Sequence, residues 1–488
     1  MIADPLRDVL TIERIVAVEP PREARLDPRD RVIAYTAIVA GTRQLHVLPV
    51  RGGTPVQVTA GEHDVSDPQW SPDGRRLAFV RDRGIWVVDV DGAREVRVSH
   101  HPAGDEAPRW SPDGHRIAFL SRRRGWPQLF VVEAPVPRRG RPRKEPREPL
   151  PQSLTAPGIE VHSAAWAPGA DRLAVSLSDG ESSRQRLAIV GLDGSFAPLA
   201  AEPGATETGA VWLDEATLLF VSDASGWFQV VRSSPDGRER TFVTAGEREH
   251  GDPGGSFGWA PLVSPDGSNV VHLEVRDGVA DLVVAPLAGT PKRGRGRPPK
   301  HPKPLPGVAG GRVNPWDGVW RAVGWLPDGS AIVALGESET RPADLWLLPV
   351  PGLAAEGARP RQLTDSLPAV LRPAFAPGRA VPGERISLAA RDGLRLEGTL
   401  WRPPAASGKR GAPRVPTIVY PHGGPTAQAW RGWSPFKQLL VREGFAVLDI
   451  DFRGSTGYGR RFREGNHGEW GHADVHDVAV VFLGHAPR

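Results

Sequence analysis

A five-residue run late in the sequence has the make-up of a catalytic backbone loop. Residues Pro421–Pro425 read Pro-His-Gly-Gly-Pro and directly follow the apolar run Val415–Tyr420. A glycine-rich turn after a strand can aim backbone N–H groups at the negatively charged oxygen that develops during acyl transfer. The loop therefore points to acyl-transfer chemistry, which additionally requires a nucleophile and a base.

Ser256 is a candidate nucleophile by its motif, but the residues around it do not fit that role. Residues Gly254–Gly258 match the Gly-x-Ser-x-Gly pattern of a nucleophile elbow. That elbow works because a strained turn from a strand into a helix exposes the serine hydroxyl. No strand-then-helix pattern surrounds Ser256, so we interpret this run as a glycine-rich loop.

The remaining candidates predict neither a metal nor a cofactor. His472 and His476 lie four residues apart beside Asp477, a spacing that can bind metal. No glutamate follows the first histidine, and we expect a solvated helix face. The run Gly454–Gly459 lacks the Lys-Ser/Thr pair of a phosphate-binding loop.

Composition predicts a soluble protein with two or three domains. The 488 residues are 39% hydrophobic and 24% charged, and they include no cysteine. No run approaches the roughly 18 apolar residues of a membrane span, and the N-terminal residues lack the pattern of a signal peptide. The absence of cysteine suits a reducing compartment. We therefore expect a cytoplasmic location and no membrane partner.

The basic pI of 9.6 comes from two short segments. Residues 138–148 contain six Lys/Arg and two Glu, and residues 292–303 contain six Lys/Arg and no acid. We expect extended Pro/Arg-rich loop insertions at 135–151 and 291–307. Their cores, Arg138–Lys144 and Lys292–Lys300, look like AT-hooks, which bind the minor groove of A·T-rich DNA. Such short motifs match often by chance, so a nucleic-acid partner is the less favoured reading.

Internal repeats fill residues 25–372. One unit spans Asp67–Gly92 and its neighbour spans Ala107–Val132. Each has a strand ending in Trp, a Ser-Pro-Asp-Gly turn, a strand of alternating apolar residues and a third strand. Weaker copies begin at Leu26, Trp166, Trp212, Val263 and Trp325. Repeats of about 40 to 50 residues with several strands each are typical of a β-propeller, and we predict about seven blades.

A different pattern follows the repeats. Residues 373–383 are predicted to be a linker, after which Glu384–Trp401 forms a hairpin with an Asp-Gly turn. Strands at Val415–Tyr420 and Phe445–Asp451 alternate with helices at Phe436–Glu443 and Asp474–Leu483, and this alternation is the start of a doubly wound α/β domain. The first helix is predicted to place Phe436, Leu439 and Leu440 on one apolar face, and the second to place Val475, Val478, Ala479 and Phe482 on another. The predicted organisation is therefore an N-terminal segment (1–24), a β-propeller (25–372), a linker (373–383) and part of an α/β domain (384–488).

Three motifs in this order resemble the prolyl oligopeptidase family of serine peptidases. They are the loop Pro421–Pro425, the run Asp451–Gly459 (Asp-Phe-Arg-Gly-Ser-Thr-Gly-Tyr-Gly), and the tail Trp470–Asp477. The repeats in front of them agree with the resemblance, which is nearest to the acylaminoacyl-peptidase and oligopeptidase branch. It implies a β-propeller that caps an α/β-hydrolase domain and restricts the site to short peptides, with a serine that forms an acyl-enzyme.

The resemblance also assigns roles to residues. It implies that Gly424 supplies one backbone N–H to the oxyanion hole, in a turn that includes Gly423 and Pro425. His422 is then a loop histidine that shapes the turn and not the catalytic base. Arg453, Gly454 and Tyr458 are expected to order the floor of the active site.

Nucleophile, acid and histidine base follow the loop in this family, and none of them is found before Arg488. We therefore expect this chain to be the N-terminal portion of a peptidase, inactive by itself, with an apolar sheet edge left open after Phe445–Asp451. Two other readings are a non-catalytic propeller that binds peptides or proteins, and a DNA-associated protein that uses the basic loops.

Overall fold

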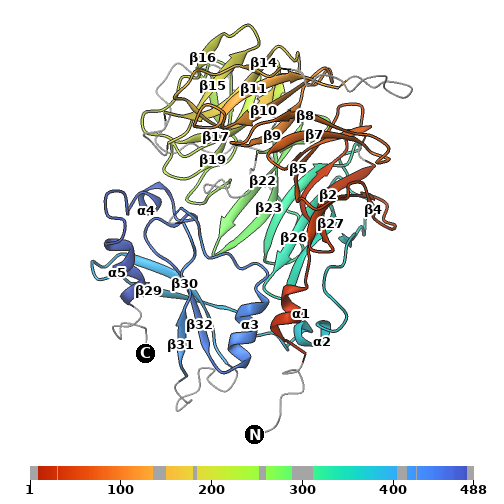
Figure 1. Ribbon diagram of the computed structural model, residues 1–488. Coiled ribbons are helices and arrows are strands. Elements are labelled where there is room, and N and C mark those ends of the chain that lie inside the picture. Colours follow the sequence, from red (N-terminus) through yellow and green to blue (C-terminus); the bar gives the residue numbers. More distant parts are fainter. Residues whose placement is uncertain are drawn as a thin grey trace.

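The computed structural model describes residues 9–29, 31–135, 150–179, 184–251, 260–287, 311–403, 415–424 and 426–480. Figure 1 shows two parts: a propeller of β-sheets and a smaller mixed sheet with helices beside it. Ser256, Pro425 and most of the two basic insertions lie outside these residues. The predictions made for them therefore stay untested.

The described strands of the repeat region form seven four-stranded units, which confirms the β-propeller. Each unit is antiparallel, and its strands follow one another in chain order. The sixth and seventh units are joined through β23 and β25, where Ala280 pairs with Val319. The strands, blade by blade, are β1 (Arg22–Leu26), β2 (Val32–Val39), β3 (Thr42–Pro49) and β4 (Val56–Gln57); β5 (Val65–Trp70), β6 (Arg76–Arg81), β7 (Gly84–Asp89) and β8 (Glu95–His100); β9 (Asp105–Trp110), β10 (Arg116–Ser121), β11 (Gln128–Glu133) and β12 (Gln152–Ser153); β13 (Glu160–Trp166), β14 (Arg172–Ser178), β15 (Arg186–Gly191) and β16 (Phe196–Pro198); β17 (Glu207–Asp214), β18 (Thr217–Ser222), β19 (Gln229–Ser233) and β20 (Arg240–Phe242); β21 (Leu262–Val263), β22 (Asn269–Arg276), β23 (Val279–Pro286) and β24 (Gly311–Arg312); β25 (Val319–Trp325), β26 (Ala331–Ser338), β27 (Arg341–Pro349) and β28 (Arg361–Gln362).

The Ser-Pro-Asp-Gly turns connect the first two strands of a blade. In the second blade the Ser71 hydroxyl donates to Asp73 Oδ1 at 2.6 Å and accepts from the Arg76 N–H at 3.0 Å. Gly74 closes the turn with φ +63°, a conformation that costs a residue with a side chain extra strain. The polar groups of the turn are therefore hydrogen-bonded within the turn itself and need no partner from another blade.

Tryptophans at the ends of the first strands connect neighbouring blades. The indole N–H of Trp166 donates to the Arg109 carbonyl in the preceding blade at 3.0 Å, and that of Trp212 donates to the Ala165 carbonyl at 3.1 Å. Trp70 and Trp325 make the same contact with the first strands of their own preceding blades. The repeated Trp is thus a link between blades as well as a core residue.

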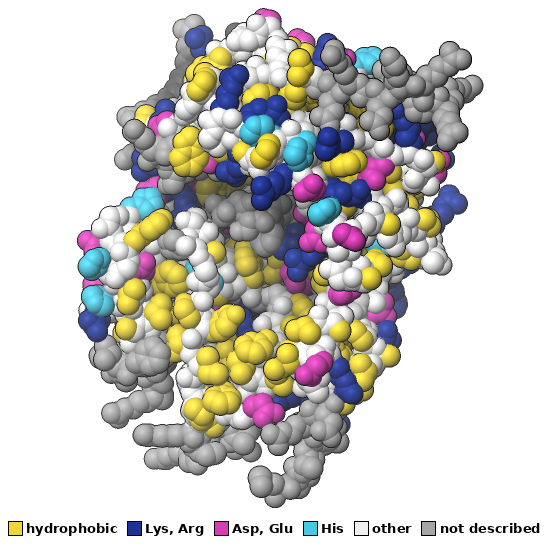
Figure 2. Space-filling view, in the orientation of Figure 1, with side chains coloured by type: hydrophobic (Ala, Val, Ile, Leu, Met, Phe, Trp, Pro, Cys, Tyr) yellow, Lys and Arg dark blue, Asp and Glu magenta, His cyan; other side chains and the backbone are white. Residues whose placement is uncertain are grey.

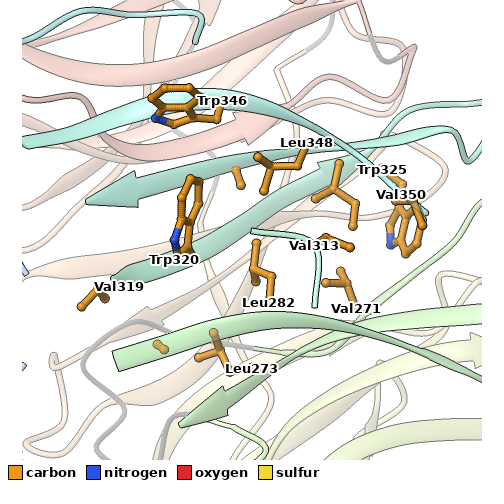
Figure 3. Close-up of a cluster of buried hydrophobic side chains, with 13 residues drawn as sticks. Val271, Leu273, Leu282, Val313, Val319, Trp320, Trp325, Trp346, Leu348 and Val350 are labelled. Atoms are coloured by element: carbon orange, nitrogen blue, oxygen red, sulfur yellow. The ribbon is translucent and has the colours of Figure 1, made fainter. Parts of the chain in front are cut away.

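Apolar side chains fill the interfaces between blades. Each of seven buried clusters draws its residues from two adjacent blades. The cluster between the sixth and seventh blades includes Leu282 and Trp320, both fully buried, and Figure 3 shows their side chains converging from facing sheets. The core of the propeller is therefore distributed around the ring.

The ring closes between the first and seventh blades without exchanging a strand. Each of these blades is made of one continuous chain segment. Their contact consists of a shared apolar cluster, with Ile33 and Leu345 fully buried, and of Arg361, whose guanidinium donates to the carbonyls of Val50 and Arg51 at 2.7 and 3.1 Å. Packing and side-chain hydrogen bonds hold this junction.

The second part contains a four-stranded sheet in the order β29-β30-β32-β31. Its elements are β29 (Glu384–Ala389), β30 (Arg395–Trp401), β31 (Thr417–Val419), α3 (Pro435–Arg442), β32 (Ala446–Asp451), α4 (Arg460–Arg463) and α5 (Ala473–Ala479). β31 and β32 are parallel, and together with the propeller this confirms the predicted fold class.

Two details of the sequence-based prediction for this sheet were wrong. The sequence predicted an open sheet edge after Phe445–Asp451, but β32 lies inside the sheet, between β30 and β31. Among the described strands, the open edge on this side is formed by β31. Phe436 of α3 is 45% exposed while Lys437 and Val441 are buried, because Lys437 turns inward to pair with Asp449.

Two short helices lie where the parts meet. α1 (Ile12–Val16) precedes the first blade, and α2 (Arg372–Phe375) begins just before the predicted linker. Ile15 and Phe375 share an apolar cluster with Trp433 of the second part. The Val381 N–H and carbonyl pair with the Gln438 amide at 2.9 and 2.8 Å. The connecting segment is therefore anchored to both parts.

Among the described residues, no helix is both long and apolar enough to cross a membrane.

The link between blades predicts a difference between two similar tryptophans. Trp166 and Trp110 are 9% and 8% exposed, but among the described residues the Trp110 indole N–H has no hydrogen-bond partner. Trp166→Phe loses both ring area and a hydrogen bond, whereas Trp110→Phe loses ring area and weakens the stacking of the Arg76 guanidinium, which lies 4.6 Å from the ring centroid, but loses no hydrogen bond. We expect Trp166→Phe to lower the free energy of unfolding by about 1 kcal/mol more than Trp110→Phe, as measured by urea denaturation. Equal losses would show that the hydrogen bond contributes nothing.

Candidate active site

The candidate site lies at the carboxyl ends of the two parallel strands. The loop with His422 follows β31, and the Asp451–Gly459 run begins at the last residue of β32. Ligands of open α/β sheets bind beyond the carboxyl ends of their strands. This edge of the sheet also carries the contacts with the fifth propeller blade, because the Arg460 N–H donates to the Gly226 carbonyl at 2.7 Å.

Gly423 and Gly424 present exposed backbone at this edge. Gly424 has φ +139°, and a Cβ added there would lie 2.8 Å from the Thr426 nitrogen. A Cβ added at Gly423 would meet nothing within 4 Å. Only Gly424 therefore requires glycine for steric reasons, while its role as oxyanion donor stays a prediction.

His422 is held by both of its ring nitrogens. Its Nδ1 lies 2.8 Å from the Gly423 carbonyl, which can only accept, so this nitrogen carries a proton. Its Nε2 lies 2.8 Å from the Ser455 hydroxyl, and its ring stacks on Phe452 with centroids 4.6 Å apart. These contacts tie the loop to the run that follows β32.

Asp451 begins one of the three motifs, but the sequence analysis assigned it no role. Its side chain is fully buried, and it accepts from the Ala429 N–H at 2.7 Å and from the Tyr458 hydroxyl at 2.5 Å. His422 Nε2 lies 3.7 Å away. Burial raises the pKa of Asp451 above its usual range, against the opposing effect of these donors.

Tyr458 and Arg385 complete the surroundings of Asp451. The Arg385 guanidinium, carried by β29, donates to the Tyr458 hydroxyl at 3.0 Å and lies 3.9 Å from Asp451. Burial raises the pKa of Tyr458 well above its usual value, and the Asp451 carboxylate raises it further. Tyr458 thus stays a neutral donor to Asp451.

Arg453 joins three segments of the second part. Its backbone N–H and guanidinium donate to Asp477 of α5 at 2.9 and 2.7 Å. The same guanidinium reaches Asp392 in the β29–β30 turn at 2.9 Å. Hydrogen bonding to Asp477 raises the pKa of Arg453. Because Asp477 faces inward, Val475 of α5 is 55% exposed instead of lying on the predicted apolar face.

The Gly454–Gly459 run is a turn with little free space around it. Gly454, Gly457 and Gly459 all have positive φ. A Cβ at Gly454 would lie 2.3 Å from the Asn466 amide nitrogen, and one at Gly457 would lie 2.2 Å from the Gln428 amide oxygen. The turn packs under the loop, where the Thr456 N–H donates to the Ala427 carbonyl at 2.8 Å.

The other sequence candidates do not join this site. His472 and His476 of the α5 region are exposed. Within the described ranges, no three His, Cys, Asp or Glu side chains form a group that could hold a metal ion.

Two acidic residues of the propeller, Asp223 of the fifth blade and Glu249 of the segment between β20 and β21, contact the glycine turn and the basic residues that follow it. Asp223 is fully buried and pairs with Arg463, while Arg460 lies 3.7 Å from it. Glu249 is 1% exposed; it accepts from the Phe228 N–H at 2.5 Å and from the Gly459 N–H at 3.1 Å. No signal in the sequence distinguishes Glu249 from other acids, because its donors lie far away along the chain.

Comparisons with known proteins agree with this architecture. Residues 18–139 match a TolB beta propeller domain model, and residues 434–483 match the prolyl oligopeptidase family model. The chain is similar to dipeptidyl aminopeptidase BIII of Pseudoxanthomonas mexicana, with 38% identity over 22% of this chain and 16% of the relative. It is also similar to the acylamino-acid-releasing enzyme of Homo sapiens, with 41% identity over 18% of this chain and 11% of the relative.

Solved structures extend the likeness to the fold of almost the whole chain. A puromycin-hydrolyzing peptidase of Mycobacterium tuberculosis superposes with a TM-score of 0.76 at 19% identity, covering 98% of this chain and 73% of the other. An acylaminoacyl peptidase of Pyrococcus horikoshii gives a TM-score of 0.63 at 17% identity, covering 96% and 72%.

The fold and the edge of the sheet define a propeller joined to an α/β-hydrolase sheet. The resemblance to the prolyl oligopeptidase family is confirmed by the family match over residues 434–483 and by the named peptidases among the relatives. The aligned segments span under a fifth of the length of these two relatives.

The buried Glu249 predicts a pH dependence of stability. Burial raises its pKa to about 7 from the ordinary 4.5, so the folded chain binds a proton that the unfolded chain has released between these values. The stabilisation that Glu249 gives below about pH 4.5 is therefore lost as pH rises to about 7, by up to about 3 kcal/mol. Glu249→Gln should remove this part of the pH dependence in urea midpoints measured between pH 5 and pH 8.

The matched control is Glu274→Gln on strand β22, where the carboxylate pairs with Arg248 at 2.5 Å. This variant should keep the wild-type pH dependence. Parallel pH profiles for wild type and Glu249→Gln would refute the assignment to Glu249.

Proposed function

We propose that this chain belongs to a serine peptidase of the prolyl oligopeptidase family that hydrolyses short peptides through an acyl-enzyme. The observation that carries the proposal is the exposed turn at Gly423 and Gly424, at the carboxyl ends of β31 and β32 and next to the propeller. The family match over residues 434–483 supports it. Peptides are the substrates that this reading implies, and a cytoplasmic location goes with it.

In the proposed reaction the Gly424 N–H stabilises the oxyanion of the tetrahedral intermediate. A donor of this kind must be rigidly placed, because its contribution depends on being aimed at the charge before it develops. The contacts of His422 with Gly423 and Ser455, together with that of Asp451 with Ala429, supply this rigidity on both sides of the turn. We place the nucleophile, the acid and the base outside the residues described here.

The first test measures the mass and the labelling of the native protein, which is captured from its source cells through an epitope on the propeller. We expect its intact mass to exceed the 52.6 kDa of this chain, and we expect a serine-reactive fluorophosphonate to label it. The purified 488-residue chain should stay unlabelled. A native product of 52.6 kDa that binds peptides but does not react would favour the non-catalytic propeller instead, and stoichiometric labelling of the purified chain would show that it carries its own nucleophile.

Two glycine variants of the native peptidase test the oxyanion turn. Gly424→Ala displaces the turn because its Cβ would lie 2.8 Å from the Thr426 nitrogen, whereas Gly423→Ala meets nothing within 4 Å. We expect kcat for peptide hydrolysis to fall about 100-fold in Gly424→Ala and to stay within a few-fold in Gly423→Ala. Equal kcat values for the two variants would remove Gly424 from the oxyanion hole.

A further inference from the structure

The glycine turn at Gly454–Gly459 touches both the oxyanion loop and the propeller. On the side of the loop, Thr456 N–H donates to the Ala427 carbonyl at 2.8 Å, and Ser455 contacts His422 at 2.8 Å. Tyr458 reaches the same loop through Asp451, which accepts from the Ala429 N–H. Three neighbouring residues of the turn thus hold three points of the loop.

The propeller side of the turn begins one residue later. The Gly459 N–H donates to Glu249 Oε1 at 3.1 Å, and the other oxygen of Glu249 accepts from the Phe228 N–H of the fifth blade. The Arg460 N–H donates to the Gly226 carbonyl at 2.7 Å, and the Arg460 guanidinium donates to the Gly204 carbonyl at 2.9 Å. Arg463 forms an ion pair with the buried Asp223.

The turn has little room to absorb a movement of either partner. A Cβ at Gly459 would lie 3.1 Å from both the Gly226 carbonyl oxygen and the Trp227 ring, and one at Gly457 would meet Gln428 and Val275. Val275 belongs to the propeller and Gln428 to the oxyanion loop. In a closely packed region a displacement at one side is passed on instead of being taken up by empty space.

We infer that Glu249 is a positioning residue for the oxyanion loop, acting from the propeller through the Gly454–Gly459 turn. The carboxylate fixes Gly459 against the fifth blade, and the turn then sets where Ala427, Ala429 and His422 lie. Docking of the propeller is in this way coupled to the geometry of the loop. The inference builds on the proposed function, since the loop matters for catalysis only if Gly424 binds the oxyanion.

The coupling can be measured on the 488-residue chain itself, without catalytic activity. Hydrogen–deuterium exchange read by mass spectrometry compares three regions: the loop at 421–430, the docking segment at 459–464, and β6–β7 of the second blade as an internal reference. Glu249→Ala removes the acceptor of the Gly459 N–H and that of the Phe228 N–H in the fifth blade, but it removes no hydrogen bond of the loop itself. We expect exchange in both the docking segment and the loop to become about tenfold faster, with the reference region unchanged.

A second variant tests the route inside the turn. Tyr458→Phe removes the donor to Asp451 and should speed exchange in the loop while the Phe228 region of the propeller keeps its protection. Tyr35→Phe is the matched control, because Tyr35 is also buried, at 5% exposure, but lies in the first blade. It should leave the loop unchanged.

Two outcomes would overturn the inference. Glu249→Ala could speed exchange in the docking segment and leave the loop as in the wild type, which would show that the turn transmits nothing. It could speed exchange everywhere, including the second blade, which would make Glu249 a residue of general stability. The isosteric Glu249→Gln variant keeps an oxygen that can accept from the Gly459 N–H, so we expect it to keep loop exchange closer to wild type than Glu249→Ala does. Because this readout is independent of fluorophosphonate labelling, failure of the coupling and failure of the peptidase proposal are distinguishable.

Discussion

Buried carboxylates that need donors organise the part of this molecule where chemistry is proposed. A carboxylate removed from water is costly unless hydrogen bonds replace its hydration. Glu249 and Asp451 are both almost completely buried, and each is supplied by backbone N–H groups from segments that are distant in sequence. The hydrogen bonds to these two carboxylates connect the propeller, the glycine turn and the loop after β31.

The propeller provides the fixed frame for this arrangement. Its turns satisfy their own polar groups locally, as at Ser71 and Asp73, and its tryptophans then link one blade to the next. Because every apolar cluster spans two blades, no single blade has a core of its own. The ring is closed by side chains and not by an exchanged strand. The contact of Arg361 with the first blade therefore helps to hold the first and seventh blades together.

A hollow lies between the two parts on the face shown in Figure 2. Figure 2 shows Lys, Arg, Asp, Glu and His side chains around this hollow, while hydrophobic side chains gather on the face of the smaller part below it. Tyr420 and Phe436, which are 46% and 45% exposed, belong to that part. Charged and polar side chains therefore surround the hollow on this face, and the apolar surface lies near the open edge at β31.

Much of the architecture could be read from local sequence. The spacing of Trp and Ser-Pro-Asp-Gly predicts strands and turns because each turn is satisfied within six residues, and the alternation of strands and helices after residue 384 predicts an α/β sheet. The loop with Gly424 and the run with Arg453 were likewise recognisable, since their glycines occupy conformations and close approaches that glycine permits.

What only the tertiary structure decided is which distant groups meet. Arg385 and Glu249 carry no local signal, because each depends on partners elsewhere in the fold: Glu249 and Gly459 are 210 residues apart along the chain. Asp451 lies in a recognisable motif, but its contacts could not be read from that motif. The inward turn of Lys437 and Asp477 could not be foreseen from helical periodicity either, since an ion pair overrides the apolar face. Sequence by itself determined the repeated units and the loop, and the pairing of buried charges over long distances determined how they are placed against each other.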